Sequence, residues 1–195
     1  MASISHDMRA RDTDCSLTLI EKENDCGRHA SDRNSGVLHA GFYYAPRSLK
    51  AMLTRTGNQE MTDYCEAHGL PINRCGKLVV AKDQRDHPAL DELQRRGQAN
   101  GISIHAILEH DAKLIEPRVK TCERALFSPT TSTVDPRQVL AVMKADAIRE
   151  GVRVECGVQY IGRQGPSMMT WAGSYQAGYT HYRFRAMSVN ESGHC

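Results

Sequence analysis

The sequence predicts an α/β fold in which at least some strands pair in parallel. Short apolar or β-branched runs, such as Leu17–Ile20 and Gly76–Ala81, alternate along the chain with segments of helical periodicity. Proline and glycine stand where several of those helical segments would begin and end. Strands that alternate with helices of this length are typical of α/β folds with parallel pairing.

The first half of the chain predicts one strand and one long helix. Leu17–Ile20 is followed by the sequence EKE, which predicts a short buried strand with acidic residues at its carboxyl end. From Pro46 the apolar spacing becomes that of a helix, which we expect to end at Gly69 and to bend near Gly57. The apolar face of this helix carries Leu49, Met52, Leu53, Met61, Tyr64 and Cys65.

The second half repeats the alternation and then loses it. Strands are expected in Gly76–Ala81, Ile102–Leu108 and Val152–Gly162, with a loop or strand in Ala125–Pro136. Helices are expected in His87–Gly101, Asp111–Pro117 and Pro136–Gly151. From Gly165 onward the periodicity decays, so we expect residues 166–195 to be irregular, with poor order beyond about Tyr179.

The composition excludes two classes of partner and predicts a location. The 195 residues carry a net charge of +2, with no basic block of the kind that binds nucleic acid or an anionic membrane surface. The longest apolar runs are far too short to cross a bilayer, and no secretory signal pattern opens the chain. We therefore expect no nucleic-acid partner, no transmembrane segment, and a soluble, cytoplasmic protein.

Cysteines and histidines argue against a metal centre. The seven cysteines are an odd number without a CxxC pair, which predicts reduced and mostly buried thiols. The nine histidines contain no HExxH motif, and His105 with His110 lacks a convincing third ligand. We therefore expect no bound metal.

Glu21 is the first candidate for a cofactor contact. In dinucleotide-binding βαβ units an acidic residue at the end of the second strand hydrogen-bonds a ribose, with a glycine-rich loop roughly 20 residues upstream. Glu21 stands at such a strand end, but no glycine precedes Gly27, so the GxGxxG turn is absent from the sequence. Taken alone, Glu21 is better explained as a solvated surface carboxylate.

The stretch RNSGVLHAGFYY, Arg33–Tyr44, is either a turn-rich connector or the wall of a site that a ligand approaches closely. It is followed by SLKA, a helix that contains GN, then CEAHGL and CGKLVVA. These motifs, in this order, resemble the L-2-hydroxyglutarate dehydrogenase/oxidase family, FAD enzymes related to D-amino-acid oxidase. The resemblance extends from about Cys15 to Ile161. Its matching positions are Asn34–Gly41, Tyr43, Tyr44, Ser48–Ala51, Gly57, Asn58, Cys65, Gly69 and Cys75–Leu78.

The resemblance implies FAD as cofactor and names residues that would bind it. Glu21 would hold the adenosine ribose, and the backbone near Val158 would pass the adenine. Asn34, Ser35 and Gly36 would line the pyrophosphate and flavin region, where small residues and backbone amides suit an anion.

The resemblance also implies a reaction, the oxidation of L-2-hydroxyglutarate to 2-oxoglutarate with hydride transfer to the flavin. That chemistry needs a base near the substrate hydroxyl. His39 is the candidate, as a base or a flavin-side contact, with a structural histidine that holds the loop as the alternative. A dicarboxylate substrate also needs cationic or hydroxyl partners. Tyr43, Tyr44 and Lys50 are candidates, and each is equally compatible with a packing or surface role.

The resemblance divides the chain into four parts. Residues 1–75 would be part of a Rossmann-like FAD-binding domain without its first strand, and residues 76–134 part of an inserted antiparallel substrate domain. Residues 135–165 would return to the FAD-binding domain, and residues 166–195 would be an irregular, out-of-frame tail. We therefore expect a fragment truncated at both ends, with impaired activity on its own.

Other functions stay open at this point. The chain could be a non-catalytic remnant, or a subunit that requires a partner chain to supply the phosphate loop. It could also oxidise a related 2-hydroxy acid or an amino acid, because shared flavin machinery does not identify the substrate. A peripheral membrane electron acceptor is compatible with this chemistry, and the oligomeric state is left undecided.

Overall fold

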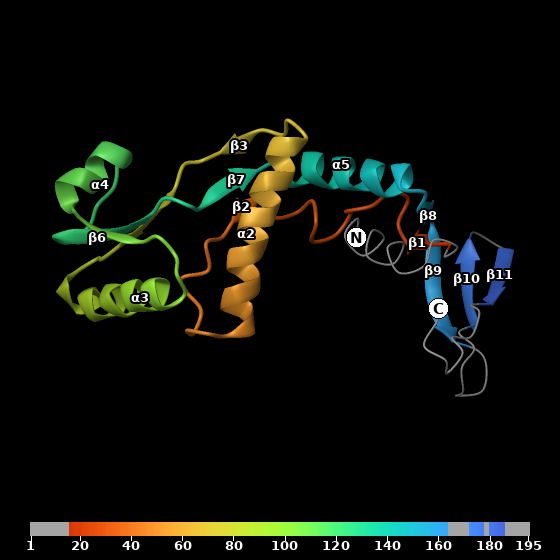
Figure 1. Ribbon diagram of the computed structural model, residues 1–195, viewed down its shortest axis with the longest axis horizontal. Coiled ribbons are helices and arrows are strands. Elements are labelled where there is room, and N and C mark those ends of the chain that lie inside the picture. The colour runs from red at the N-terminus through yellow and green to blue at the C-terminus, as the bar shows by residue number, and fades with distance from the viewer. Residues whose placement is uncertain (1–15, 164–171, 178–179, 186–195) are drawn as a thin grey trace. The chain divides into compact units, whose positions relative to one another are not determined.

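The chain divides into two compact units. The computed structural model describes residues 16–163, 172–177 and 180–185. Unit 1 combines Met1–Arg33 with Arg137–Cys195, and unit 2 is the intervening stretch Asn34–Pro136. Strands and helices alternate through much of the chain (Figure 1). The predicted α/β fold is confirmed, and among the described strands the parallel pairing is limited to one pair.

Unit 1 contains this parallel pair and one long helix. Its elements are β1 (Thr18–Glu21), α5 (Pro136–Arg149), β8 (Arg153–Cys156), β9 (Val158–Arg163), β10 (Ala172–Ala177) and β11 (Thr180–Arg185). β1 and β8 pair in parallel, and their last residues, Glu21 and Cys156, lie opposite each other. Leu140 of α5 lines a small apolar cavity together with Leu19 of β1 and Val154 of β8. The helix therefore covers one face of the parallel pair.

Two described segments, β10 and β11, correct part of the prediction that residues 166–195 are irregular. β9, β10 and β11 form an antiparallel sheet with β10 in the middle. Main-chain hydrogen bonding to a neighbouring strand defines such strands, and it requires no alternation of apolar side chains. The rest of the predicted tail lies outside the described residues. Gly157, with φ +74°, separates β8 from β9, so the single strand expected over Val152–Gly162 is two strands.

Unit 2 is built around the central strand of an antiparallel sheet. The sheet order is β4 (Lys77–Val80), β6 (Arg124–Ser128) and β5 (His105–Leu108). Three helical segments accompany it: η1 (Gln84–Asp86), α3 (His87–Ala99) and α4 (Glu109–Ile115). Figure 1 shows α3 and α4 on either side of β6, and both contact it. The core cluster consists of Ala40, Phe42, Ala81, Leu90, Ile102, Ile104 and Leu126.

A second small sheet and helix α2 complete unit 2. β2 (Val37–Leu38) and β3 (Ile72–Asn73) each pair antiparallel with β7 (Ser132–Val134). Two-residue strands are too short to show a period, which is why the sequence did not predict β2 and β3. α2 (Leu49–Ala67) confirms the predicted long helix and runs unbroken through Gly57. Ser48 Oγ accepts a hydrogen bond from the Ala51 N–H, and this contact caps the start of α2.

The cysteines differ from the prediction in burial. All five described cysteines are free, but only Cys65 is buried, whereas Cys75 is exposed. Cys26, Cys122 and Cys156 are half-buried. The expectation of mostly buried thiols is therefore wrong, because Cys75 lies in a connection between two strands and Cys26 lies in the loop after β1.

Two glycines of the α2 region give a stability prediction. Gly57 lies inside the helix and Gly69 follows its end with φ +64°, and an added Cβ would meet no atom within 4 Å at either position. We expect Gly57→Ala to raise the free energy of unfolding by about 0.5–1 kcal/mol, because alanine favours a helix interior. Gly69→Ala should lower the free energy of unfolding by about 1 kcal/mol. An added Cβ meets no neighbour there, so the whole cost comes from holding alanine in a left-handed backbone conformation. Urea denaturation of both variants measures this, and a stabilised Gly69→Ala protein would contradict the described end of α2.

Candidate functional site

Two predicted cofactor residues lie at the carboxyl end of the parallel pair. Glu21 ends β1, is half-buried, and its Oε1 accepts a hydrogen bond from the Glu23 N–H at 2.9 Å. Val158 is 3% exposed and begins β9 just after β8 has ended. In open α/β sheets ligands bind beyond the carboxyl ends of the strands. Glu21 and Val158 therefore stand where a nucleotide would be expected in such a sheet.

A cation-rich cavity lies beside the loop that follows β1. It has a volume of about 540 Å³, and all the residues that line it belong to unit 1. Its charged residues are Arg28, Arg33, Arg137 and Lys144 against Asp25 and Asp32. Because cations are in excess, the cavity suits an anionic group. Asp32 Oδ1 is buried and has no hydrogen-bond partner among the described residues, so a ligand hydroxyl could donate to it.

Sequence reasoning missed this cavity. Arg28 and Arg33 stand in the segment GRHASDR, which ends where the stretch Arg33–Tyr44 begins, and they were the available signal. Lys144 lies 119 positions from Asp25, yet its Nζ is 2.5 Å from Asp25 Oδ1. Only the packing of α5 beside the loop brings these charges together, so spacing along the chain could not reveal them.

Three side chains near this cavity raise the question of a metal. Asp25, Cys26 and Cys156 place one potential ligand atom each within 4.8 Å of the others. However, Lys144 already pairs with Asp25, and a neighbouring cation opposes the binding of a metal ion. Burial raises the pKa of the Cys26 thiol, whereas a metal requires the thiolate. The arrangement therefore gives no reason to assign a metal centre.

The segment Asn34–Gly36 forms a tight turn. Asn34 Oδ1 accepts a hydrogen bond from the Gly36 N–H at 2.8 Å, and Gly36 has φ +66°. A Cβ at Gly36 would lie 2.0 Å from the Val134 carbonyl oxygen, so this position must be glycine for the fold itself. Ser35 between them is exposed. The pyrophosphate and flavin contacts of these three residues stay a prediction.

His39 lies near a lysine that sequence reasoning missed. His39 follows β2 and is exposed. Partial removal of the ring from water, and then the nearby charge of Lys77, lower the pKa of His39 below its ordinary value. Lys77 Nζ also lies 4.6 Å from the centroid of the Tyr43 ring. Lys77 thus lies close to both His39 and Tyr43. It belongs to the CGKL motif that matched the family pattern.

The other two predicted substrate residues form a separate pair. Lys50 Nζ lies 4.5 Å from the centroid of the Tyr44 ring. The Tyr44 carbonyl accepts a hydrogen bond from Asn100 Nδ2 at 3.1 Å, which holds the loop before α2 against the end of α3. The three predicted residues therefore belong to two lysine–tyrosine pairs: Lys50 with Tyr44, and Tyr43 with Lys77, which the sequence did not predict. Their roles toward a substrate stay a prediction.

The family of the chain follows from its sequence over most of its length. Residues 2–178 match the family described as FAD dependent oxidoreductase (DAO). The chain belongs to this family. FAD as the cofactor and oxidoreduction as the reaction class, both implied by the resemblance, are thereby confirmed at the level of the family.

Curated relatives carry one enzyme name. The chain is 36% identical over 166 residues to "L-2-hydroxyglutarate dehydrogenase, mitochondrial" of Nematostella vectensis, which covers 84% of this chain and 36% of the relative. It is 41% identical over 125 residues to the protein of that name from Pongo abelii, over 64% of this chain and 30% of the relative. The Escherichia coli L-2-hydroxyglutarate dehydrogenase is 35% identical over 130 residues. The chain thus spans about a third of the length of these relatives.

Solved structures share the fold. L-alpha-glycerophosphate oxidase from Mycoplasma pneumoniae, with FAD bound, has a TM-score of 0.79 at 20% identity, over 92% of this chain and 47% of that one. Glycine oxidase from Geobacillus kaustophilus has a TM-score of 0.78 at 18% identity, over 95% of this chain and 50% of that one. The predicted partial FAD-binding fold is therefore confirmed.

The names of the curated relatives contradict the expected cytoplasmic location. The relatives from Nematostella vectensis, Pongo abelii and Homo sapiens are named mitochondrial proteins. As for membranes, none of the described helices is both long enough and apolar enough to cross a bilayer.

The Gly36 turn predicts a strong effect of a single methyl group. Gly36→Ala should lower the free energy of unfolding by more than about 2 kcal/mol, because the new Cβ would collide with the Val134 carbonyl at an unfavourable φ. Gly69→Ala is the matched control, since it shares the positive φ but has open space. If both variants lose the same stability in urea denaturation, the close contact with Val134 is wrong.

The surroundings of His39 predict its protonation. Its pKa should lie below the ordinary value of histidine, which favours the neutral ring, and stability should be lost as the pH falls through the range in which the ring takes up its proton. Lys77→Met should raise the pKa of His39, because it removes a neighbouring positive charge and keeps the side-chain length. NMR titration of the ring protons measures this value. Lys50→Met is the control, and an equal shift in that variant would contradict the assignment to Lys77.

Proposed function

We propose that the chain is part of an FAD-dependent oxidoreductase that oxidises L-2-hydroxyglutarate to 2-oxoglutarate. The observation that carries this proposal is the 36% identity over 166 residues to a protein named L-2-hydroxyglutarate dehydrogenase. The aligned part covers 84% of the chain, far more than a single motif. The grouping of His39 with Lys77 supports it, because a base beside a cation suits the oxidation of a hydroxy acid.

The residues of the chain fit an FAD cofactor. We propose that the cavity lined by Arg28, Arg33 and Arg137 supplies positive charge for the pyrophosphate. Asp32, whose Oδ1 is buried without a described partner, would accept a hydrogen bond from a ligand hydroxyl. Glu21 would accept a hydrogen bond from the adenosine ribose at the end of β1.

The remaining cofactor contacts are proposed from the motif. Val158 would pass the adenine with its backbone, and Asn34, Ser35 and Gly36 would line the pyrophosphate and flavin region. Gly36 would act there through its main chain only, because the fold leaves no room for a side chain. FAD, when bound, supplies the acceptor for the hydride that leaves C2 of the substrate.

His39 is proposed as the base. Its lowered pKa favours the neutral ring, whose unprotonated nitrogen can take the proton of the substrate hydroxyl as the C2–H bond is broken. Lys77 would bind a substrate carboxylate near His39, and its charge keeps the imidazole neutral before the reaction. Tyr43, held under Lys77, would offer its hydroxyl to the same carboxylate. Lys50 and Tyr44 would bind the second carboxylate of the substrate through their ammonium and hydroxyl groups.

A second candidate function is supported by the length comparison. The chain spans 36% or less of the relatives described above, so a partner chain, or the rest of a longer protein, would complete the substrate site. In this case residues 76–134 would contribute only part of the substrate domain. The names of the eukaryotic relatives support a mitochondrial setting, and a peripheral membrane acceptor would then reoxidise the flavin.

Flavin reduction tests the leading proposal. The purified chain mixed with FAD should retain a flavin spectrum after gel filtration, and anaerobic L-2-hydroxyglutarate should bleach it. His39→Gln should keep the flavin and slow bleaching by about 10²–10⁴-fold, because the base is lost. His110→Gln is the matched control, since His110 is exposed and lies on α4.

Other results would decide between the alternatives. A colourless chain that cannot be reconstituted supports the candidate that requires a partner. Bleaching by another 2-hydroxy acid or an amino acid, but not by L-2-hydroxyglutarate, overturns the proposed substrate. Glu21→Gln should weaken FAD binding about tenfold, and Glu155→Gln on β8 is its control.

A further inference from the structure

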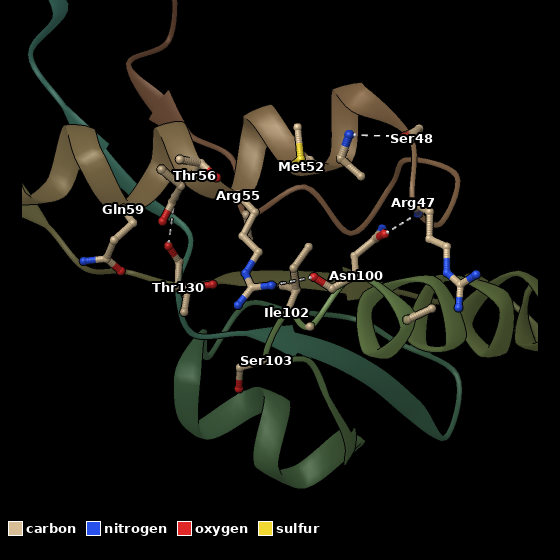
Figure 2. A pocket seen from close by; sticks show the side chains of 15 residues that line it. Arg47, Ser48, Met52, Arg55, Thr56, Gln59, Asn100, Ile102, Ser103 and Thr130 are labelled. Carbon is tan, nitrogen blue, oxygen red and sulfur yellow. Dashed lines mark hydrogen bonds between the residues drawn. The ribbon is translucent and has the colours of Figure 1, made fainter.

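A cavity on unit 2 contains none of the residues predicted to bind cofactor or substrate. It has a volume of about 790 Å³ and lies between the first turns of α2 and the end of α3 (Figure 2). Its lining residues all fall between Ala40 and Thr130, within unit 2. A volume of this size is within the range of small-molecule sites. The cavity therefore needs an explanation of its own.

The charge of this cavity is entirely positive. Arg47 and Arg55 line it, and no aspartate or glutamate is among the lining residues. Neither guanidinium forms an ion pair with a described residue, and the other polar groups are amides and hydroxyls, such as Asn58, Gln59 and Ser103. Guanidinium groups bind carboxylates and phosphates through paired, charge-assisted hydrogen bonds. The cavity thus offers donors to an anion and no competing negative charge.

Asn100 contacts the main chain of Arg47 and the guanidinium of Arg55. Its Oδ1 accepts a hydrogen bond from the Arg47 N–H at 3.2 Å, and its carbonyl oxygen accepts one from Arg55 Nη1 at 3.3 Å. Figure 2 shows Arg55 reaching from α2 to Asn100. A Cβ on Gly101 would lie 2.8 Å from Arg55 Nη1, so glycine provides the space beside this guanidinium. Arg55 is therefore positioned before any ligand binds, which lowers the cost of ordering it.

Arg47 has an unusual backbone conformation at the rim of this cavity. Its φ is +60°, a region that non-glycine residues rarely occupy. Asn100 Oδ1 fixes this conformation through the Arg47 N–H, while the Arg47 side chain stays at the cavity. The apolar part of the lining, which includes Ala51, Met52 and Ile102, suits a short methylene chain between two charged ends.

We propose that this cavity binds a small organic dicarboxylate through Arg47 and Arg55. The site differs in its residues from the proposed flavin and substrate contacts, so it is a second anion site on the same chain. A dicarboxylate fits better than a single inorganic anion, because two guanidiniums and an intervening apolar surface are present. The proposal needs no flavin, and it does not depend on the reaction proposed above.

Isothermal titration with glutarate tests this site on the 195-residue chain without added FAD. Glutarate carries two carboxylates but no hydroxyl that the flavin reaction could oxidise. Wild-type protein should bind it, and Arg47→Gln and Arg55→Gln should each weaken binding about tenfold or more. Arg95→Gln is the matched control, because Arg95 lies on α3 and pairs with Glu92 outside the cavity.

Titrations with a further variant and with other ligands test the role of Arg55 and the choice of a dicarboxylate. Arg55→Lys keeps the charge but loses the planar fork, so it should bind glutarate more weakly than wild-type and more tightly than Arg55→Gln. Circular dichroism confirms that each variant is folded. Absence of glutarate binding by wild-type protein, or equal loss in Arg95→Gln, overturns the site. Tighter binding of inorganic phosphate, or equal binding of neutral glutaramide, overturns the dicarboxylate assignment.

Discussion

The contact between Gly36 and Val134 is the constraint on which the candidate site of unit 2 depends. The Gly36 carbonyl accepts a hydrogen bond from the Val134 N–H at 2.9 Å, and the absence of a side chain lets the two backbones meet. This contact starts the pairing of β2 with β7, in which Val37 lies opposite Thr133. His39 follows this pair directly, so its place relative to the sheet is set by backbone geometry. The turn at Gly36 therefore stabilises the pairing of β2 with β7, independently of any contact with a cofactor.

Positive charge is concentrated in three places although the whole chain has a net charge of only +2. One is the cavity of unit 1, one is Lys77 beside His39, and one is the cavity between Arg47 and Arg55. Most of the other basic residues that the structure describes pair with a neighbouring carboxylate, as Arg95 and Arg96 do with Glu92, whose pKa falls to about 2 through these two guanidiniums. The net charge of the chain alone therefore does not reveal where positive charge is concentrated.

The sequence predicted the long elements and missed what depends on distant pairing. The helices at α2, α3, α4 and α5 were visible because each carries a 3.6-residue period with terminal glycine or proline signals. β10 and β11 were missed because main-chain hydrogen bonds between the two strands define them, and these bonds leave no pattern of apolar residues in the sequence. Glu21 and His39 were proposed from a strand end and from an ordered motif, and their roles stay predictions. Lys77 could be linked to His39 only after the fold brought β4 beside the loop that follows β2. Asn100 was missed for the same reason, since its partners Arg47 and Arg55 lie 53 and 45 positions away.

The close contact between Gly36 and Val134 also bears on how the segment between them can be replaced during evolution. Unit 2 runs from Asn34 to Pro136, and the close backbone contact joins two residues near these limits. A segment whose two ends meet can be exchanged, shortened or enlarged with little disturbance to the polypeptide on either side of it. Within a flavoprotein family, whole-segment replacement would therefore offer a route to new substrates that leaves the nucleotide-binding strands unaltered. Point substitution inside the loop of residues 34–39 would be far more restricted, because that loop closes the segment.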